Sequence, residues 1–214
     1  YHILDTSPEK EYDAITRLAA FICNVSVAFI VLIDAERQWF KSKYGAGTQE
    51  TLHAGAFSNF VTLSDEIQEI DDALKDNTFK DSTGATGQTI RFYAGVPLID
   101  PQGYHLGALC VTDTVPRKLN PGQRDSLQTL AAEVISHFTL HRQQLELEKS
   151  LAQYKEFHDL FDTSPDIHCI MEREFKIERV NQSIKSVLGY QANALIGQHI
   201  WQLFPEEERI VFLE

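Results

Sequence analysis

The feature that most constrains this chain is one long run with a helical pattern, from Pro121 to about Phe161. Asn120 can cap its start, and Pro121 suits a first helical turn. The first half carries an apolar stripe able to cover a sheet, formed by Leu127, Leu130, Ala131, Val134 and Phe138. At ~1.5 Å per residue this helix would be about 60 Å long, far more than one small domain needs. We therefore expect one full domain, a connecting helix and a second element.

The second half of this helix changes its spacing to steps of four and three residues. The positions concerned are Leu140, Gln144, Leu147, Leu151, Tyr154, His158 and Phe161. This is a heptad seam with polar breaks at Gln144 and His158, and it favours a coiled-coil linker over residues 141–160. The alternative is a long helix that packs along its own domain.

Residues 1–140 combine helical and strand patterns. Ser7 and Pro8 predict the start of a helix, and Asn24 is its expected end. Residues 27–33 form an unbroken apolar run rich in β-branched side chains, which is typical of a central strand.

A hairpin follows, in which residues 38–44 return with Phe40 and Tyr44 expected on one face. Further short strands are expected at 66–70, 90–99 and 104–112. The last two are joined by Asp100-Pro101-Gln102-Gly103, which has strong turn chemistry. Beyond the long helix, residues 167–172 and 176–180 predict two more strands, and helices are expected around 182–188 and after Gln191.

Composition excludes several classes of protein. A net charge of −12 argues against a broad nucleic-acid surface, since phosphate binding needs clustered Lys and Arg. No run approaches the ~20 apolar residues that span a bilayer, and no secretory signal opens the chain. Cys23, Cys110 and Cys169 are odd in number and far apart, which indicates free thiols in a reducing compartment. We expect a cytoplasmic protein without membrane contact in this segment, and the initial Tyr1 indicates a piece of a longer protein.

Four stretches within residues 1–140 resemble the GAF domains of bacterial sensor kinases and cyclic-di-GMP enzymes. They are ILDTSPE (3–9), LIDAERQWFK (32–41), IRFYAGVPL (90–98) and GALCVTD (107–113), in matching order and spacing. The resemblance implies an antiparallel sheet flanked by helices, holding a small molecule or a protein contact. The expected fold class is therefore α+β.

The chain from about Phe157 is similar to the opening of a PAS domain. The matching parts are LFDTSPD (160–166), VN (180–181), LGY (188–190) and LIGQ (195–198). A PAS domain would continue for another three strands. Residues 161–214 are thus expected to be its N-terminal part, a partial α/β unit.

The segments that would surround a GAF pocket offer apolar walls with a few polar groups. The predicted ligand-binding residues are Phe40, Phe57, Asn59, Tyr93 and Cys110. The alternative is that these side chains simply fill the core. Relatives often carry a Cys and His pair around residues 57–60, and this chain has neither. The ligand or cofactor stays unknown.

Other motifs that could carry chemistry are incomplete. His158-Asp159-Leu160 resembles a kinase phospho-acceptor box, but Phe161 stands where a basic residue belongs. His137 and His141 could share a metal, yet no third ligand is near in sequence. Gly84 to Thr89 lacks the lysine of a phosphate loop. No cysteine is followed by His, as bilin attachment would require. We predict no catalytic and no metal site.

We expect a regulatory sensory fragment, not itself an enzyme, from a bacterial histidine kinase or a diguanylate cyclase or phosphodiesterase. It would relay binding of a small ligand or a partner through a homodimeric helical linker to an output domain elsewhere in the parent protein. Two alternatives come from other classes. One is a GAF-fold redox enzyme acting on a small molecule, similar to free methionine sulfoxide reductases, and the other is a ligand-free dimerisation scaffold.

Overall fold

The computed structural model describes residues 1, 3–34, 38–45, 64–76, 79, 89–205 and 207. It divides into two compact units, Tyr1–Gln143 (unit 1) and Gln144–Glu214 (unit 2). Both mix helices with antiparallel strands, so the expected α+β class is confirmed. Within the described ranges, no helix is both long and apolar enough to cross a membrane.

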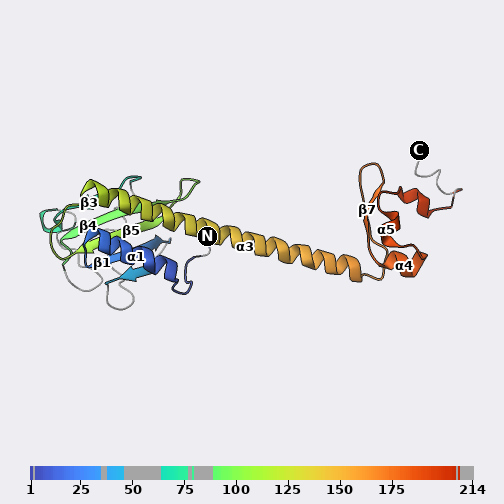
Figure 1. Ribbon diagram of the computed structural model, residues 1–214, viewed down its shortest axis with the longest axis horizontal. Helices are drawn as coiled ribbons and strands as arrows, with labels where there is room; N and C mark the ends of the chain where they lie inside the picture. Colours follow the sequence, from blue (N-terminus) through green and yellow to red (C-terminus); the bar gives the residue numbers. More distant parts are fainter. Residues whose placement is uncertain are drawn as a thin grey trace. The chain divides into compact units, whose positions relative to one another are not determined.

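Unit 1 is built on a five-stranded antiparallel sheet of order β2-β1-β5-β4-β3 (Figure 1). The strands are β1 (Val27–Ile33), β2 (Gln38–Tyr44), β3 (Gln68–Ile70), β4 (Phe92–Ile99) and β5 (His105–Asp113). A single turn of 3-10 helix, η1 (Ala73–Lys75), follows the edge strand β3. Each strand lies where its pattern predicted it, although β3 is shorter than the expected 66–70.

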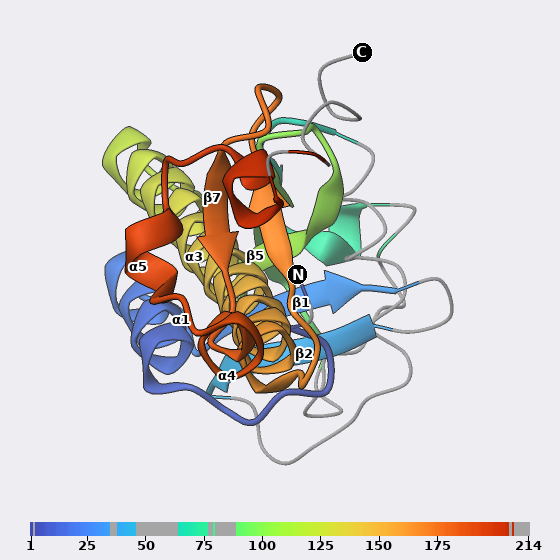
Figure 2. The ribbon, with the colours of Figure 1, turned by 90° about the vertical axis from the view of Figure 1, so that its right-hand side faces the viewer.

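Two helices cover one face of this sheet, namely α1 (Lys10–Cys23) and the first part of α3 (Pro121–Thr163) (Figures 1 and 2). Asn24 ends α1 in the left-handed conformation, with φ of 53°, as the sequence predicted. The predicted start was wrong, because α1 begins at Lys10 and Ser7 does not cap it. The backbone carbonyl of Ser7 instead accepts a hydrogen bond from the buried Lys41 ammonium.

The two faces of the sheet carry separate apolar clusters, because side chains alternate along each strand. The helix-covered cluster takes Ile30 from β1, Ala94 from β4 and Leu109 from β5, and it packs against Leu127 and Phe138 of α3. The opposite face takes the residues in between. A single strand therefore contacts both clusters.

A β-bulge in β2 interrupts this alternation. Ile30 pairs with Ser42 and Val31 pairs with Phe40, so Lys41 is the extra residue. Lys41 consequently faces α1, while Phe40 joins the cluster on the opposite face. Tyr44 lies near Leu18 on the α1 side. The prediction that Phe40 and Tyr44 share a face was therefore wrong.

The long helix forms as predicted, as the 43-residue α3. Asn120 caps it reciprocally: its side chain accepts from the Gln123 N–H at 2.9 Å, and the Gln123 side chain accepts from the Asn120 N–H at 3.0 Å. Five of the seven seam residues are exposed, namely Leu140, Gln144, Leu147, Leu151 and Tyr154. Phe161, the last predicted seam position, is instead buried within unit 2.

Unit 2 consists of the second part of α3 and a small two-stranded sheet with short helices. Its elements are β6 (Cys169–Met171), β7 (Ile177–Val180), α4 (Ser183–Leu188), α5 (Ala192–Leu195) and η2 (Ile200–Leu203). Ile177, Val180, Ile184 and Leu195 form its core. Asn181 is fully buried there and bonds to the carbonyl of Phe161 at 2.9 Å, which fastens the last turn of α3.

Candidate functional site

The face of the unit 1 sheet away from the helices carries a cluster of apolar side chains that we call the Tyr93 cluster. Its buried members are Val31, Ile70, Ala73, Phe79, Tyr93, Ala108 and Cys110, with Phe29, Phe40 and Ile90 packed at its margin. All five strands and η1 contribute to the cluster. The composition of the cluster, largely apolar with a few polar groups, is that of small-molecule sites.

Tyr93 and Cys110 supply the polar atoms at the centre of the cluster. The Tyr93 hydroxyl lies 3.2 Å from the Cys110 sulfur, and both side chains are fully buried. Burial raises the pKa of the Cys110 thiol to about 12. Burial also raises the pKa of Tyr93 well above its ordinary value, as does the neighbouring Cys110. At neutral pH the pair therefore offers protonated hydrogen-bonding groups, and the thiol is not a nucleophile.

Aromatic rings and a cation mark the β1–β2 margin of the cluster. The Phe29 and Phe40 rings meet edge to face, with centroids 5.4 Å apart. The Lys43 ammonium lies 4.1 Å from the Phe40 ring centre. The bulge at Lys41 places Lys43 and Phe40 on the same face of the sheet.

The structure brings together three of the five predicted ligand-binding residues, Phe40, Tyr93 and Cys110. Phe57 and Asn59 lie outside the described residues. The sequence prediction missed Phe29, Val31 and Ile70, which belong to the same cluster. The first two sit in an apolar run buried on both faces, so the sequence gives no alternation that would assign them to one face.

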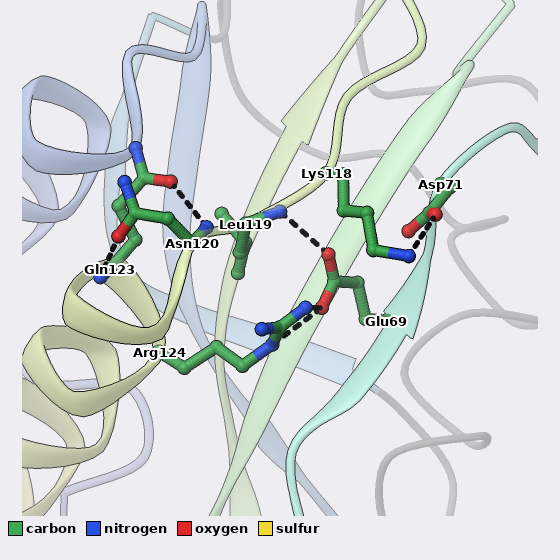
Figure 3. Close-up of polar contacts among 7 residues, drawn as sticks. All are labelled: Glu69, Asp71, Lys118, Leu119, Asn120, Gln123 and Arg124. Atoms are coloured by element: carbon green, nitrogen blue, oxygen red, sulfur yellow. Dashed lines mark hydrogen bonds and ion pairs between the residues drawn. The ribbon is translucent and has the colours of Figure 1, made fainter.

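The cluster meets a set of polar contacts at the edge strand β3. Ile70 pairs with Tyr93 across the β3–β4 ladder and belongs to the cluster. The preceding residue, Glu69, points to the other side and binds the segment that leads into α3 (Figure 3). Glu69 Oε1 accepts from the Leu119 N–H at 2.7 Å, and Oε2 accepts from Arg124 Nη2 at 2.7 Å and Nε at 2.9 Å. We call this set of contacts the Glu69 clamp.

Two further contacts are made by the residues that follow Glu69 in sequence. The Asp71 carbonyl accepts from the Arg117 N–H at 3.1 Å. Asp72 forms a fork with Arg91, with N···O distances of 2.7 Å and 2.9 Å. Hydrogen bonding to the Arg91 guanidinium lowers the pKa of Asp72 to about 2.

A buried cation joins two of the stretches singled out in the sequence. The Lys41 ammonium donates to Thr6 Oγ1 at 2.7 Å and to the Ser7 carbonyl at 3.1 Å, and it pairs with the Glu9 carboxylate. It also lies 4.9 Å from the Tyr12 ring centre. The bulge therefore ties the N-terminal segment to β2, and this contact is structural.

His158 and His137, two of the histidines considered from the sequence, have local partners. His158 contacts the Tyr154 hydroxyl at 2.6 Å and Arg179 at 3.2 Å. His137 lies 3.4 Å from Glu133, one helical turn away. In the part of the chain that the structure describes, no three His, Cys, Asp or Glu side chains gather as a metal-binding group.

Comparison with known families assigns both parts of the chain. A family profile for the GAF domain matches residues 7–137. A profile for the PAS domain matches residues 165–214. These matches confirm the resemblances drawn from the sequence stretches.

Individual relatives agree with this assignment. A cyclic di-GMP phosphodiesterase of Pseudomonas aeruginosa is 33% identical over 116 residues, covering 54% of this chain and 20% of that protein. This chain thus spans about a fifth of the length of that curated relative.

Two solved structures share the fold of unit 1. The GAF domain of an Acinetobacter phosphoenolpyruvate-protein phosphotransferase has a TM-score of 0.52 at 20% identity, over 63% of this chain and 84% of that one. A domain assigned to a two-component sensor histidine kinase protein of Sinorhizobium meliloti has a TM-score of 0.51 at 17% identity, over 68% of this chain and 99% of that one.

Proposed function

The chain belongs to the GAF family, with a PAS domain after it, and we propose that it is the sensory and relay segment of a bacterial signalling protein. The parent protein would be a histidine kinase or an enzyme that makes or degrades cyclic di-GMP. The phosphodiesterase relative and the sensor-kinase domain of the same fold support this choice.

The observation that carries the proposal is the continuity of α3. One 43-residue helix begins at the Glu69 clamp and ends at the buried Asn181. A helix fixed at both ends can pass a rotation or a shift from the first domain to the second.

The exposed seam of α3 supports a homodimer in which this helix pairs with its copy. Leu147 is 69% exposed and Leu151 is 50% exposed, at heptad spacing with Leu140 and Tyr154. Pairing with a second α3 would remove these side chains from water. The burial of Phe161 in unit 2 ends this seam before the last predicted position.

The Tyr93 cluster is the proposed sensing surface, for a small and largely apolar ligand. Phe40, Tyr93 and Cys110 would supply apolar contacts and the central polar atoms. The protonated Cys110 thiol supports binding over redox catalysis, which would need a reactive thiolate. All three cysteines are unpaired, which supports a reducing, cytoplasmic location.

Light scattering on the purified chain over a concentration series tests the relay. We expect a dimer. Leu147→Lys with Leu151→Lys should weaken association at least about a hundredfold, because two leucines that the dimer would bury become charges. The matched control, Ala152→Lys with Gln153→Lys, adds the same charge off the seam and should remain dimeric. A monomer at every concentration would contradict the dimeric relay.

Native mass spectrometry of gently purified protein tests the sensing surface. We expect a small molecule to be retained, and Tyr93→Phe to reduce its occupancy by removing the central hydroxyl. Protein that never carries a ligand, while still a dimer, would instead favour a ligand-free dimerisation scaffold.

A further inference from the structure

The edge strand β3 contacts a different part of unit 1 on each face of the sheet. Ile70 is buried in the Tyr93 cluster, directly opposite Tyr93 in the ladder. Glu69 pairs with Ala94, which belongs to the helix-covered cluster, and its carboxylate reaches the start of α3 (Figure 3). Since neighbouring side chains of a strand point to opposite faces, a displacement of this backbone must move both contacts.

The connection between β3 and α3 is short and charged. Leu119 N–H donates to Glu69 just before the helix cap, and Arg124 donates to it from the first turn of α3. The Glu69 side chain is 13% exposed and that of Arg124 is 32% exposed. Charge-assisted bonds of this kind are stronger than neutral ones.

Further backbone hydrogen bonds join the residues after β3 to the strands that form the cluster. The Ala73 N–H donates to the Arg91 carbonyl at 2.7 Å, and the Arg91 N–H donates to the Asp113 carbonyl at 2.8 Å. Ala73 itself is a buried member of the Tyr93 cluster. Residues 69–73 therefore form one hydrogen-bonded piece that lines the cluster and holds the start of α3.

We infer that the Glu69 clamp transmits a change at the Tyr93 cluster to the first turn of α3. This inference rests on the proposed sensing surface and specifies how its state reaches the relay helix. A ligand that repacks Ile70 shifts β3, the shift loosens or tightens the clamp, and the first turn of α3 responds. Coupling of this kind needs one element whose position depends on both sites. The strand β3 is such an element, because it contacts the Tyr93 cluster and carries Glu69 of the clamp.

Amide hydrogen exchange of Leu119 in the whole chain reports the state of the clamp without any ligand. Glu69→Gln should accelerate exchange at Leu119 by about tenfold, because it removes the ionic acceptor. Lys118→Ala is the matched control. It removes the neighbouring ion pair with Asp71 (3.5 Å), whose Lys118 side chain is 74% exposed, and should leave Leu119 unchanged.

A second pair of variants tests the coupling. Ile70→Ala should accelerate Leu119 exchange several-fold, whereas Val31→Ala should not, because Val31 lies in the same cluster but on β1. In the Glu69→Gln background, Ile70→Ala should add little, since the clamp is already open. Slow exchange retained in β5 would show that each variant remains folded.

Two outcomes would overturn the inference. One is an equal response of Leu119 to Ile70→Ala and Val31→Ala, and the other is an Ile70→Ala effect that persists in full without the Glu69 carboxylate. If Ile70→Ala does not fold, Ile70→Val and Arg124→Lys repeat the cycle with smaller changes. If Leu119 exchange in these variants does not follow the expected pattern while the protein is a dimer that carries a ligand, only the role of the clamp is contradicted. If the exchange pattern is as expected but the protein is a monomer without ligand, only the proposed function is contradicted.

Discussion

The two ends of α3 are fastened by chemically different contacts. At its start, the Glu69 carboxylate accepts from Leu119 N–H and from a partly exposed Arg124. At its end, the neutral and fully buried Asn181 donates to the Phe161 carbonyl and accepts from the His168 N–H at 3.0 Å. The strength of a charged contact near solvent varies with salt and pH. A buried amide with several backbone partners does not vary in this way, because breaking it leaves buried polar groups unsatisfied. Regulation is therefore expected at the first fastening.

The largest effect should come from removing the second fastening. Asn181→Ala leaves the carbonyls of Phe161 and Asp166 and the His168 N–H without their partner. We expect unit 2 to lose about 2–4 kcal/mol, because buried polar groups become unsatisfied. Denaturant unfolding followed by exchange of unit 2 amides measures this loss, with the exposed neighbour variant Gln182→Ala as the control. If both substitutions lower the free energy of unfolding by the same amount, the buried Asn181 is not the contact that fastens the end of α3.

A smaller effect should come from salt, which acts on one end only. Raising NaCl from about 0.1 to about 1 M shortens the screening length from about 10 to about 3 Å. Leu119 exchange should accelerate a few-fold, since its acceptor belongs to an ion pair with Arg124. His168 donates to a neutral amide oxygen, so its exchange should not change. Equal salt responses at these two amides would contradict the distinction.

Acid should act beside the Glu69 clamp through Asp72, which follows β3 and pairs with Arg91. The Arg91 fork lowers the pKa of Asp72 from 3.8 to about 2, so its contribution is complete above about pH 4 and disappears as the pH falls toward 2. Wild type should therefore lose stability in unit 1 over this range more steeply than Asp72→Asn. The difference between their acid unfolding curves isolates this carboxyl from the other acids. Parallel curves would show that the fork does not stabilise the segment.

Local patterns in the sequence predicted most of the fold. The unbroken run 27–33 and the helical pattern from Pro121 correspond to β1 and α3. The bulge at Lys41 could not be predicted, because one extra residue leaves the rest of a strand pattern intact. Phe161 has the spacing of the seam, yet it is buried in unit 2. Periodicity shows that a helix face is apolar, but it cannot distinguish a second helix from the rest of the same unit as the partner of that face.

The candidate site was predicted less completely. Tyr93 and Cys110 lie in stretches that resemble the family, and the structure places them together. The Glu69 clamp joins residues 50 and 55 positions apart in the sequence, and neither Glu69 nor Arg124 belongs to a motif. Such contacts depend on the completed sheet, so local spacing carries no signal for them.

The continuity of α3 also restricts how its length can change in evolution. A helix advances ~100° per residue, so one inserted residue between the clamp and Asn181 would turn the two ends out of phase with each other. Seven inserted residues would change that phase by only about 20° and would keep the seam in line. Natural variants of this linker should therefore differ in length by whole heptads. If α3 relays a signal as proposed, its number of residues is therefore constrained as well as its sequence.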